Sequence, residues 1–194
     1  MILVLFDFDG TITKSDSLIR FIHFKNGYIK TIMGILILLP ILILYKLKLI
    51  PNYRAKQLVF SFFFKGLDSQ NFESLSKEFS LSQIDKIVRP QAMRKIAWHK
   101  KEGHKIVVVS ASIESYLKPW CNKNELDLIA TKIELKNGLV NGKFHTKNCY
   151  GEEKEIRLKE LYNLNDYDCI YAYGDSRGDK ELLALAHIKK YRTF

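Results

Sequence analysis

Cysteine is scarce in this sequence, with 3 residues among 194. Cys121, Cys149 and Cys169 lie far apart and form no C-x-x-C pair. This pattern argues against a disulfide framework and against a cysteine zinc site, and it suits a reducing compartment. A signal peptide is lacking too, because Met1 leads into an apolar run without a basic region or a cleavage site. We therefore expect a cytoplasmic protein.

Signatures of nucleic-acid binding are also missing. The sequence has no zinc-finger spacing, no basic zipper and no aromatic RNA-binding motif. Its formal net charge is nevertheless +10, which favours an anionic partner such as nucleic acid, an anionic membrane surface or a phosphorylated substrate. A solvated, lysine-rich surface would explain the same charge. We expect no nucleic-acid partner, and phosphate esters and membranes stay open.

The composition is that of a globular protein. Hydrophobic residues make up 47% of the chain and charged residues 27%, which leaves enough apolar material for a core. At 194 residues the chain fits one domain, or a core with one insertion.

Three short apolar runs predict buried parallel strands. They are Ile2–Asp7, Lys105–Ser112 and Asp168–Asp175. A weaker strand pattern, Asp127–Leu135, leads into what we expect to be a small hairpin around Gly138. Helical patterns fill the gaps between these runs, so strands and helices alternate along the chain. We predict the α/β class, with a Rossmann-like parallel sheet that is covered on both faces.

One region breaks this alternation. Residues 15–88 contain only helical patterns and no convincing strand. A helical stretch of this length between the first two predicted strands indicates an insertion. We therefore assign residues 1–14 and 89–194 to the core and residues 15–88 to an all-helical inserted domain.

Two carboxylates, Asp7 and Asp9, leave the end of the first predicted strand together. Residues i and i+2 of an extended segment point to the same side, and Gly10 allows a sharp turn behind them. Like charges this close repel unless a cation lies between them, and oxygen ligands suit Mg²⁺. An EF-hand calcium loop is excluded, because Ile12 and Leu18 occupy the positions of its glycine and glutamate. The glycine motifs of dinucleotide and P-loop sites are absent as well.

The other two predicted strands end in polar groups at the same edge of the sheet. Asp175 follows the third strand and can complete the set of metal ligands. Asp179 can hold these ligands in place without contacting the metal. Ser110 ends the second strand. Its hydroxyl, together with backbone N–H groups of the turn through Ala111, could hold phosphate oxygens at the start of the next helix.

A lysine is then expected beside the phosphate, because the negative charge of the phosphate must be offset. Lys154 is the preferred candidate, and Lys147 and Lys159 are its competitors.

In their order along the chain, these motifs resemble those of the haloacid dehalogenase-like phosphohydrolases. The helical insertion between the first two motifs is similar to the cap of the phosphoserine-phosphatase-like branch, subfamily IB. The segment WHKKEGHKIVVVSAS looks closest to hydrolases of that branch that lie near phosphatidylglycerophosphatase C. The resemblance covers essentially the whole chain, and its motifs are Asp7-Phe8-Asp9-Gly10-Thr11, Ser110, Lys154 and Gly174-Asp175-x-x-x-Asp179.

The resemblance implies a phosphatase and a role for each motif residue. Asp7 would be the nucleophile that forms an aspartyl-phosphate, and Asp9 would be the acid and base. Mg²⁺ would be held by Asp7, the backbone carbonyl of Asp9 and Asp175. The phosphate oxygens would be held by Thr11, Ser110 and Lys154.

The inserted domain has to supply the substrate contacts. Phosphoserine phosphatases bind their amino acid with an acid and an arginine; Asp16 could serve as the acid, but apolar residues stand where we expect the arginine. Arg54 and Lys56 are only approximately placed for that role. We therefore keep two substrate classes, a lipid phosphate such as phosphatidylglycerophosphate and a small soluble ester such as phosphoserine. A non-catalytic, membrane-associated binding protein with the same fold is the alternative from another functional class.

The stretch Thr31–Tyr45 contains no charged residue. As a helix, its 15 residues would span about 22 Å, less than the ~30 Å of a bilayer core, and Pro40 would kink it. The stretch therefore predicts either a buried part of the helical bundle or a segment at a membrane interface. In the second case, Lys46, Lys48 and Arg54 could reach anionic headgroups, and the protein would lie peripherally at the inner face of the membrane.

Overall fold

A parallel sheet forms the centre of the protein, whose computed structural model describes all 194 residues, Met1–Phe194. The strand order is β3-β2-β1-β6-β7, and every neighbouring pair is parallel. The predicted α/β class with a parallel core sheet is confirmed. The strands are β1 Ile2–Phe6, β2 Lys105–Ile113, β3 Asp127–Thr131, β6 Cys169–Gly174 and β7 Ile188–Tyr191.

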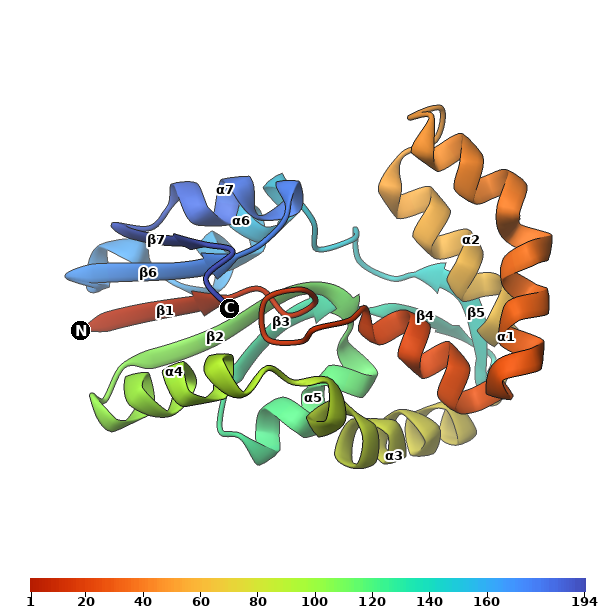
Figure 1. Ribbon diagram of the computed structural model, residues 1–194, viewed down its shortest axis with the longest axis horizontal. Helices are drawn as coiled ribbons and strands as arrows, with labels where there is room; N and C mark the ends of the chain where they lie inside the picture. Colours follow the sequence, from red (N-terminus) through yellow and green to blue (C-terminus); the bar gives the residue numbers. More distant parts are fainter.

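Helices cover both faces of this sheet (Figure 1). Side chains of β1 alternate between the two faces: Val4 and Phe6 join one hydrophobic cluster, and Leu3 and Leu5 join the other. Burial on both faces explains why this strand is a continuous apolar run. The helices are α4 Pro90–Lys101 and α5 Glu114–Lys123 on one face, and α6 Glu152–Leu161 and α7 Lys180–Ala184 on the other.

The predicted strand Asp127–Leu135 is in fact two strands. β3 ends at Thr131, and β4, Ile133–Lys136, pairs antiparallel with β5, Leu139–Phe144, in a separate hairpin. The chain leaves the main sheet at Lys132, because the backbone of this residue bonds to the segment that follows β5. The hairpin itself is confirmed.

Strand β7 has no counterpart in the prediction from the sequence. Its first residue, Ile188, is half-buried and the other three are exposed. An edge strand of this kind lacks the apolar run or the alternation that would reveal it.

Three helices and no strand occupy residues 15–88, as predicted. Helices α1 and α2 lie beyond the carboxyl ends of the core strands, at the right of Figure 1. The chain leaves the core and returns to it side by side, since the N–H of Lys14 donates to the carbonyl of Ile87 at 2.9 Å. The division into a core, 1–14 and 89–194, and an inserted domain, 15–88, stays a prediction. The helices are α1 Ser17–Lys46, α2 Asn52–Phe64 and α3 Ser69–Ile87.

An aromatic cluster holds these three helices against the core. Phe21 of α1 stacks on Phe64 of α2, with 4.9 Å between ring centroids, and meets Phe72 of α3 at 5.8 Å. The ring of Phe21 also lies 5.0 Å from Tyr116 of α5. Aromatic pairs at such distances add to the free energy gained by burial. The helical region and one face of the sheet therefore share a single hydrophobic cluster.

Helix α1 breaks at Gly27, the one residue inside it with non-helical dihedral angles, φ 74° and ψ 174°. Pro40, where we expected the kink, keeps helical dihedral angles. By length and composition alone, α1 is long and apolar enough to cross a membrane, with a mean hydropathy of 2.2 over its most apolar window.

Most of the apolar run on α1 is exposed. Its buried residues are Thr31, Gly34 and Leu38, and a Cβ on Gly34 would come within 2.3 Å of the ring of Phe63 on α2. Burial in a helical bundle, one of the two expectations, is therefore wrong, because α2 covers only this one stripe of the helix. We call the remaining surface the outer apolar face. It consists of Ile29, Ile32, Met33, Leu36, Ile37, Leu39, Ile43 and Leu44, each at least 40% exposed.

Candidate active site

Polar residues from three neighbouring strands meet at the carboxyl edge of the sheet. Asp7 directly follows β1, and its N–H donates to the carbonyl of Tyr173 in β6 at 2.9 Å. Ser110 lies in β2, and Asp175 follows β6. Because β1 pairs with both β2 and β6, the ends of these strands are adjacent. The structure brings the three residues together, as the sequence predicted.

Lys154 of α6 reaches into this edge and is almost fully buried. Its Nζ donates to Asp7 Oδ1 at 2.5 Å and to Asp179 Oδ1 at 2.7 Å. Burial alone would lower the pKa of Lys154, but the two carboxylates outweigh burial and hold this pKa above its usual range. Burial raises the pKa of Asp7 to about 7, against the opposing charge of Lys154. Lys154, rather than Lys147 or Lys159, is the lysine that the fold brings to the carboxylates.

Asp9 has a different environment. Its carboxylate accepts hydrogen bonds from the Ser17 N–H at 2.9 Å, from the Ser17 hydroxyl at 3.0 Å and from the Ser112 hydroxyl. Burial and the nearby charge of Asp16 raise the pKa of Asp9 to about 6, and the bond from Ser112 opposes the rise. A carboxyl group with such a pKa can exchange a proton near neutral pH. Reasoning from the sequence missed Ser17, and it assigned to Ser112 only a backbone N–H in the turn that would hold phosphate, not a hydroxyl that bonds to Asp9. The available signal was the position of Ser17 next to Asp16.

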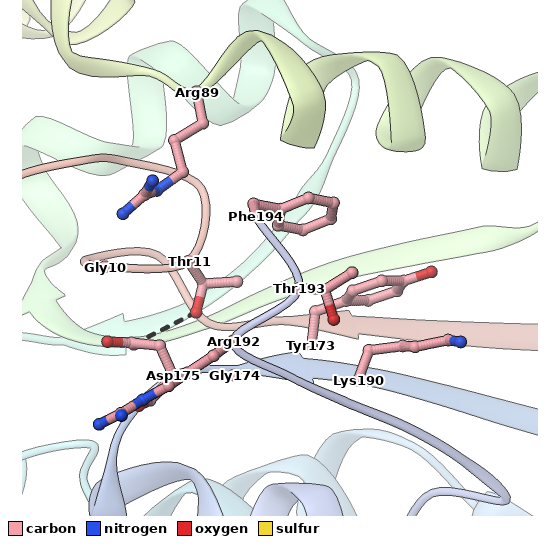
Figure 2. A pocket seen from close by; sticks show the side chains of 10 residues that line it. All are labelled: Gly10, Thr11, Arg89, Tyr173, Gly174, Asp175, Lys190, Arg192, Thr193 and Phe194. Carbon is pink, nitrogen blue, oxygen red and sulfur yellow. Dashed lines mark hydrogen bonds between the residues drawn. The ribbon is translucent and has the colours of Figure 1, made fainter.

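Asp175 and Asp179 are held in different ways. Both oxygens of Asp179 accept hydrogen bonds, and Oδ2 receives the N–H of Asp175 at 3.2 Å and the N–H of Ser176 at 2.9 Å. Asp175 accepts one side-chain hydrogen bond, from Thr11 Oγ1 at 3.3 Å (Figure 2). Gly10 lies against the same carboxylate, where a Cβ would approach Asp175 Oδ2 to 2.4 Å, and its φ of 87° also requires glycine.

The carboxylate cluster fits a divalent cation. One oxygen from each of Asp7, Asp175 and Asp179 lies within 4.8 Å of the others. Asp7 Oδ2 and Asp175 Oδ2 accept no hydrogen bond from the protein, whereas both oxygens of Asp179 are occupied. Hard oxygen donors of this kind suit Mg²⁺. Asp7 and Asp175 therefore each offer a free oxygen as a metal ligand. Asp179 instead holds Lys154 and the backbone of Asp175 and Ser176 in place.

A cavity of about 350 Å³, here called the phosphate cavity, opens at Asp7 and Asp9. Its opposite wall comes from the inserted helices and includes Leu42 and Tyr45 of α1 and Lys56 of α2. The candidate site therefore lies between the edge of the sheet and the helical region. Any substrate in it would touch both parts of the chain.

The residues predicted to contact the substrate are divided by the structure. Asp16 and Lys56 line the phosphate cavity, whereas Arg54 is exposed outside it. Asp16 also caps α1, accepting the N–H of Ile19 at 2.9 Å. The Nζ of Lys56 donates to the carbonyl of Ala111 at 2.9 Å. Of the two basic candidates, only Lys56 is placed to meet a ligand.

The predicted phosphate-binding residues are divided too. Ser110 lines the phosphate cavity, but its Oγ accepts the N–H of Ser112 at 3.0 Å. The turn expected after Ser110 is an irregularity in β2 instead, since the strand continues to Ile113. Thr11 does not line this cavity; it lines a separate cavity of about 280 Å³ on the side of Asp175 shown in Figure 2.

The chain is similar to known proteins over most or all of its length. The family model described as haloacid dehalogenase-like hydrolase matches residues 4–184. The chain is 33% identical over its whole length to Protein CicA of Caulobacter vibrioides, of which it covers 86%. It is 32% identical to a probable phosphatase of Mycobacterium tuberculosis over 63% of its own length and 44% of that protein. The crystal structure of a phosphoserine phosphohydrolase-like protein from Francisella tularensis has a TM-score of 0.68 at 18% identity, covering 97% of this chain and 84% of that one.

Lys154→Met tests how much the ammonium group of Lys154 stabilises the protein through the buried carboxylates of Asp7 and Asp179. The substitution should lower the free energy of unfolding by about 3 kcal/mol or more, because Asp7 and Asp179 would lose a buried counter-charge. Urea denaturation near neutral pH measures the change. Lys159→Met on the same helix is the matched control, since Lys159 forms an exposed pair with Glu155 and should contribute less than about 1 kcal/mol. Equal stability of the two variants would contradict this account.

Proposed function

Because the chain belongs to the haloacid dehalogenase-like hydrolases, we propose that it is a phosphatase of their phosphoserine-phosphatase-like branch, which hydrolyses phosphomonoesters with Mg²⁺ through an aspartyl-phosphate on Asp7. The observation that carries the proposal is the buried cluster in which Lys154 bonds to Asp7 and Asp179 next to Asp175. A structural ion pair would not need a third carboxylate within 4.8 Å of the first two.

In the proposed first step, a carboxylate oxygen of Asp7 forms a bond to phosphorus while the bond from phosphorus to the ester oxygen breaks. Asp9 donates its proton to the departing alkoxide. In the second step Asp9 takes a proton from water, and the water oxygen attacks the phosphorus of the aspartyl-phosphate. The bond from phosphorus to the Asp7 oxygen breaks, which releases inorganic phosphate, restores the carboxylate of Asp7 and leaves Asp9 protonated for the next cycle. The raised pKa of Asp9 supports its use as acid and then as base.

The carboxylates of Asp7 and Asp175, with the backbone carbonyl of Asp9, are the groups proposed to hold Mg²⁺. When bound, the cation supplies positive charge that offsets the charge of the phosphoryl group. Asp179 keeps Asp175 in place through its bond to the Asp175 N–H. Thr11 does the same from the other side through its hydroxyl.

The phosphate oxygens are proposed to lie against the hydroxyl of Ser110, the backbone N–H of Ala111 and the ammonium of Lys154. Ser110 and Lys154 line the cavity and are almost fully buried, so their contacts to an anion would be little screened by water.

A lipid phosphate is the substrate class that we propose, with the small phosphoserine-like ester as its alternative. The outer apolar face supports a lipid, because monomeric proteins rarely expose so many large aliphatic side chains on one helix. The same helix contributes Leu42 and Tyr45 to the phosphate cavity. Lys46, Lys48 and Arg54 follow it and would meet anionic headgroups. We propose peripheral binding at the cytoplasmic face of a membrane.

Removal of the nucleophile tests the proposed chemistry. Wild-type protein should release p-nitrophenol from p-nitrophenyl phosphate with Mg²⁺ and stop after EDTA. Asp7→Asn should retain less than about a hundredth of this turnover, because an amide cannot attack phosphorus. Its fold should survive, since loss of one of several neighbouring carboxylates relieves repulsion. Substantial residual turnover in a folded variant would point to another nucleophile.

Asp9→Asn tests the two proton transfers separately. The p-nitrophenolate group leaves without much help from an acid, so the aspartyl-phosphate should still form, while its hydrolysis lacks a base. Rapid mixing should show a burst of p-nitrophenol of about one equivalent per enzyme, followed by slow release. A steady rate equal to that of the wild type would remove Asp9 from the mechanism.

The outer apolar face can be tested with a pair of variants that differ in burial. Met33→Ser with Ile37→Ser changes side chains that are 58% and 63% exposed, so the melting temperature should stay the same. Sedimentation with anionic phospholipid vesicles should weaken by about tenfold or more, because each side chain would contribute roughly 1.5 kcal/mol in the interface. The matched variant Leu38→Ser removes a residue that is 5% exposed and should lower the melting temperature instead. Unchanged sedimentation of the double variant would contradict membrane binding.

A further inference from the structure

The phosphate cavity adjoins a larger depression, here called the side groove. The side groove has a volume of about 950 Å³, and it shares two lining residues, Asn52 and Tyr150, with the phosphate cavity. It runs between the start of α2 and the segment that connects β5 to α6. None of the residues proposed for catalysis or metal binding lines it. The groove is therefore an extension of the site away from the reacting atoms.

Tyr150 forms the boundary between the two spaces. Its ring lies directly on Gly178, where a Cβ would come within 2.2 Å of the ring, so only glycine permits this contact. Gly178 belongs to the loop between Asp175 and Asp179, and Lys154 lies four residues after Tyr150 in the sequence. The ring is 40% exposed, and its free side faces the two cavities. An aromatic surface is thus fixed next to the position of the ester bond.

The lining of the side groove is amphiphilic. Tyr53, Phe144 and Ile156 provide apolar surface. Uncharged polar groups could meet the charged and ionisable side chains of the lining, which are His145, Lys147, Glu152, Glu153 and Glu181. A small amino acid such as serine would leave this groove empty. A leaving group that has both polar and apolar parts would match this lining.

We propose that the alcohol part of the substrate extends past Tyr150 into the side groove, and that Tyr150 favours phosphomonoesters of long amphiphilic alcohols over those of small metabolites. This inference rests on the proposed phosphatase chemistry of the adjoining cavity. It differs from membrane binding by the outer apolar face, because it concerns a single substrate molecule in solution. The ring of a tyrosine offers an apolar chain a large, rigid contact surface, and ordering this side chain costs little entropy.

The test compares glycerol 3-phosphate with its 1-hexanoyl ester, which has the same reacting group and is used as a monomer without vesicles. Wild-type kcat/KM should be at least about tenfold higher for the hexanoyl ester, a difference equivalent to one good apolar contact. Tyr150→Ala should lose about tenfold in kcat/KM for this ester. Its kcat/KM for glycerol 3-phosphate should fall by clearly less than that for the hexanoyl ester, because the small alcohol does not extend into the side groove.

Two further variants complete the experiment. Tyr53→Ala changes only the side groove and should also reduce kcat/KM for the hexanoyl ester, which keeps the proposal testable if Tyr150→Ala does not fold. Tyr191→Ala removes an exposed tyrosine that lines neither space and should behave as the wild type. Equal wild-type kcat/KM for the two glycerol esters would overturn the proposal, as would an equal loss on every substrate. Failure of the wild type to hydrolyse p-nitrophenyl phosphate would instead overturn the proposed function.

Discussion

Three carboxylates cannot share a buried edge of a sheet unless a cation accompanies them, and in this protein that requirement is met by one lysine. The Nζ of Lys154 lies between Asp7 and Asp179, and the side chains of Lys154, Asp7 and Asp179 have almost no contact with water. The position of α6 is thereby fixed against the ends of β1 and β6. One oxygen of Asp7 is bound to the lysine, and the other accepts no hydrogen bond from the protein, in a side chain that lines the cavity. The ion pair that stabilises the fold is also what orients the proposed nucleophile.

A second link joins the chemistry to the inserted helices. Ser17 is the first residue of α1, and it offers both its N–H and its hydroxyl to Asp9. Its hydroxyl also lies 3.0 Å from that of Ser112, which bonds to the same carboxylate. The start of α1 and the end of β2 therefore determine the surroundings of the proposed acid and base. A displacement of α1 would change these hydrogen bonds before it changed anything at Asp7.

Local properties of the chain were sufficient to predict the three central strands β2, β1 and β6 and the acidic residues that follow β1 and β6. Asp7 and Asp9 point to the same side because of their spacing, and the ends of parallel strands must be adjacent. Lys154 was favoured but not fixed, since its selection depends on the orientation of α6. The contacts of Ser17 and Ser112 with Asp9 were missed because 95 residues separate the two serines and only the tertiary structure brings them to one carboxylate. Whether the apolar run of α1 is covered depends on the number of helices packed around it, which periodicity does not reveal.

The backbone hydrogen bond between Lys14 and Ile87 brings the two ends of the helical region next to each other. The strands of the sheet can therefore keep their positions whichever helices are inserted between β1 and the segment that leads to α4. The entropy of closing such a loop grows only with the logarithm of its length, so its size has little influence on the stability of the sheet. Evolution can lengthen, shorten or replace the chain that follows Ser17 in this region without altering strand order or register, whereas Ser17 itself has to stay where it bonds to Asp9. Substrate preference and membrane affinity can thus diverge among related proteins while the catalytic edge stays the same.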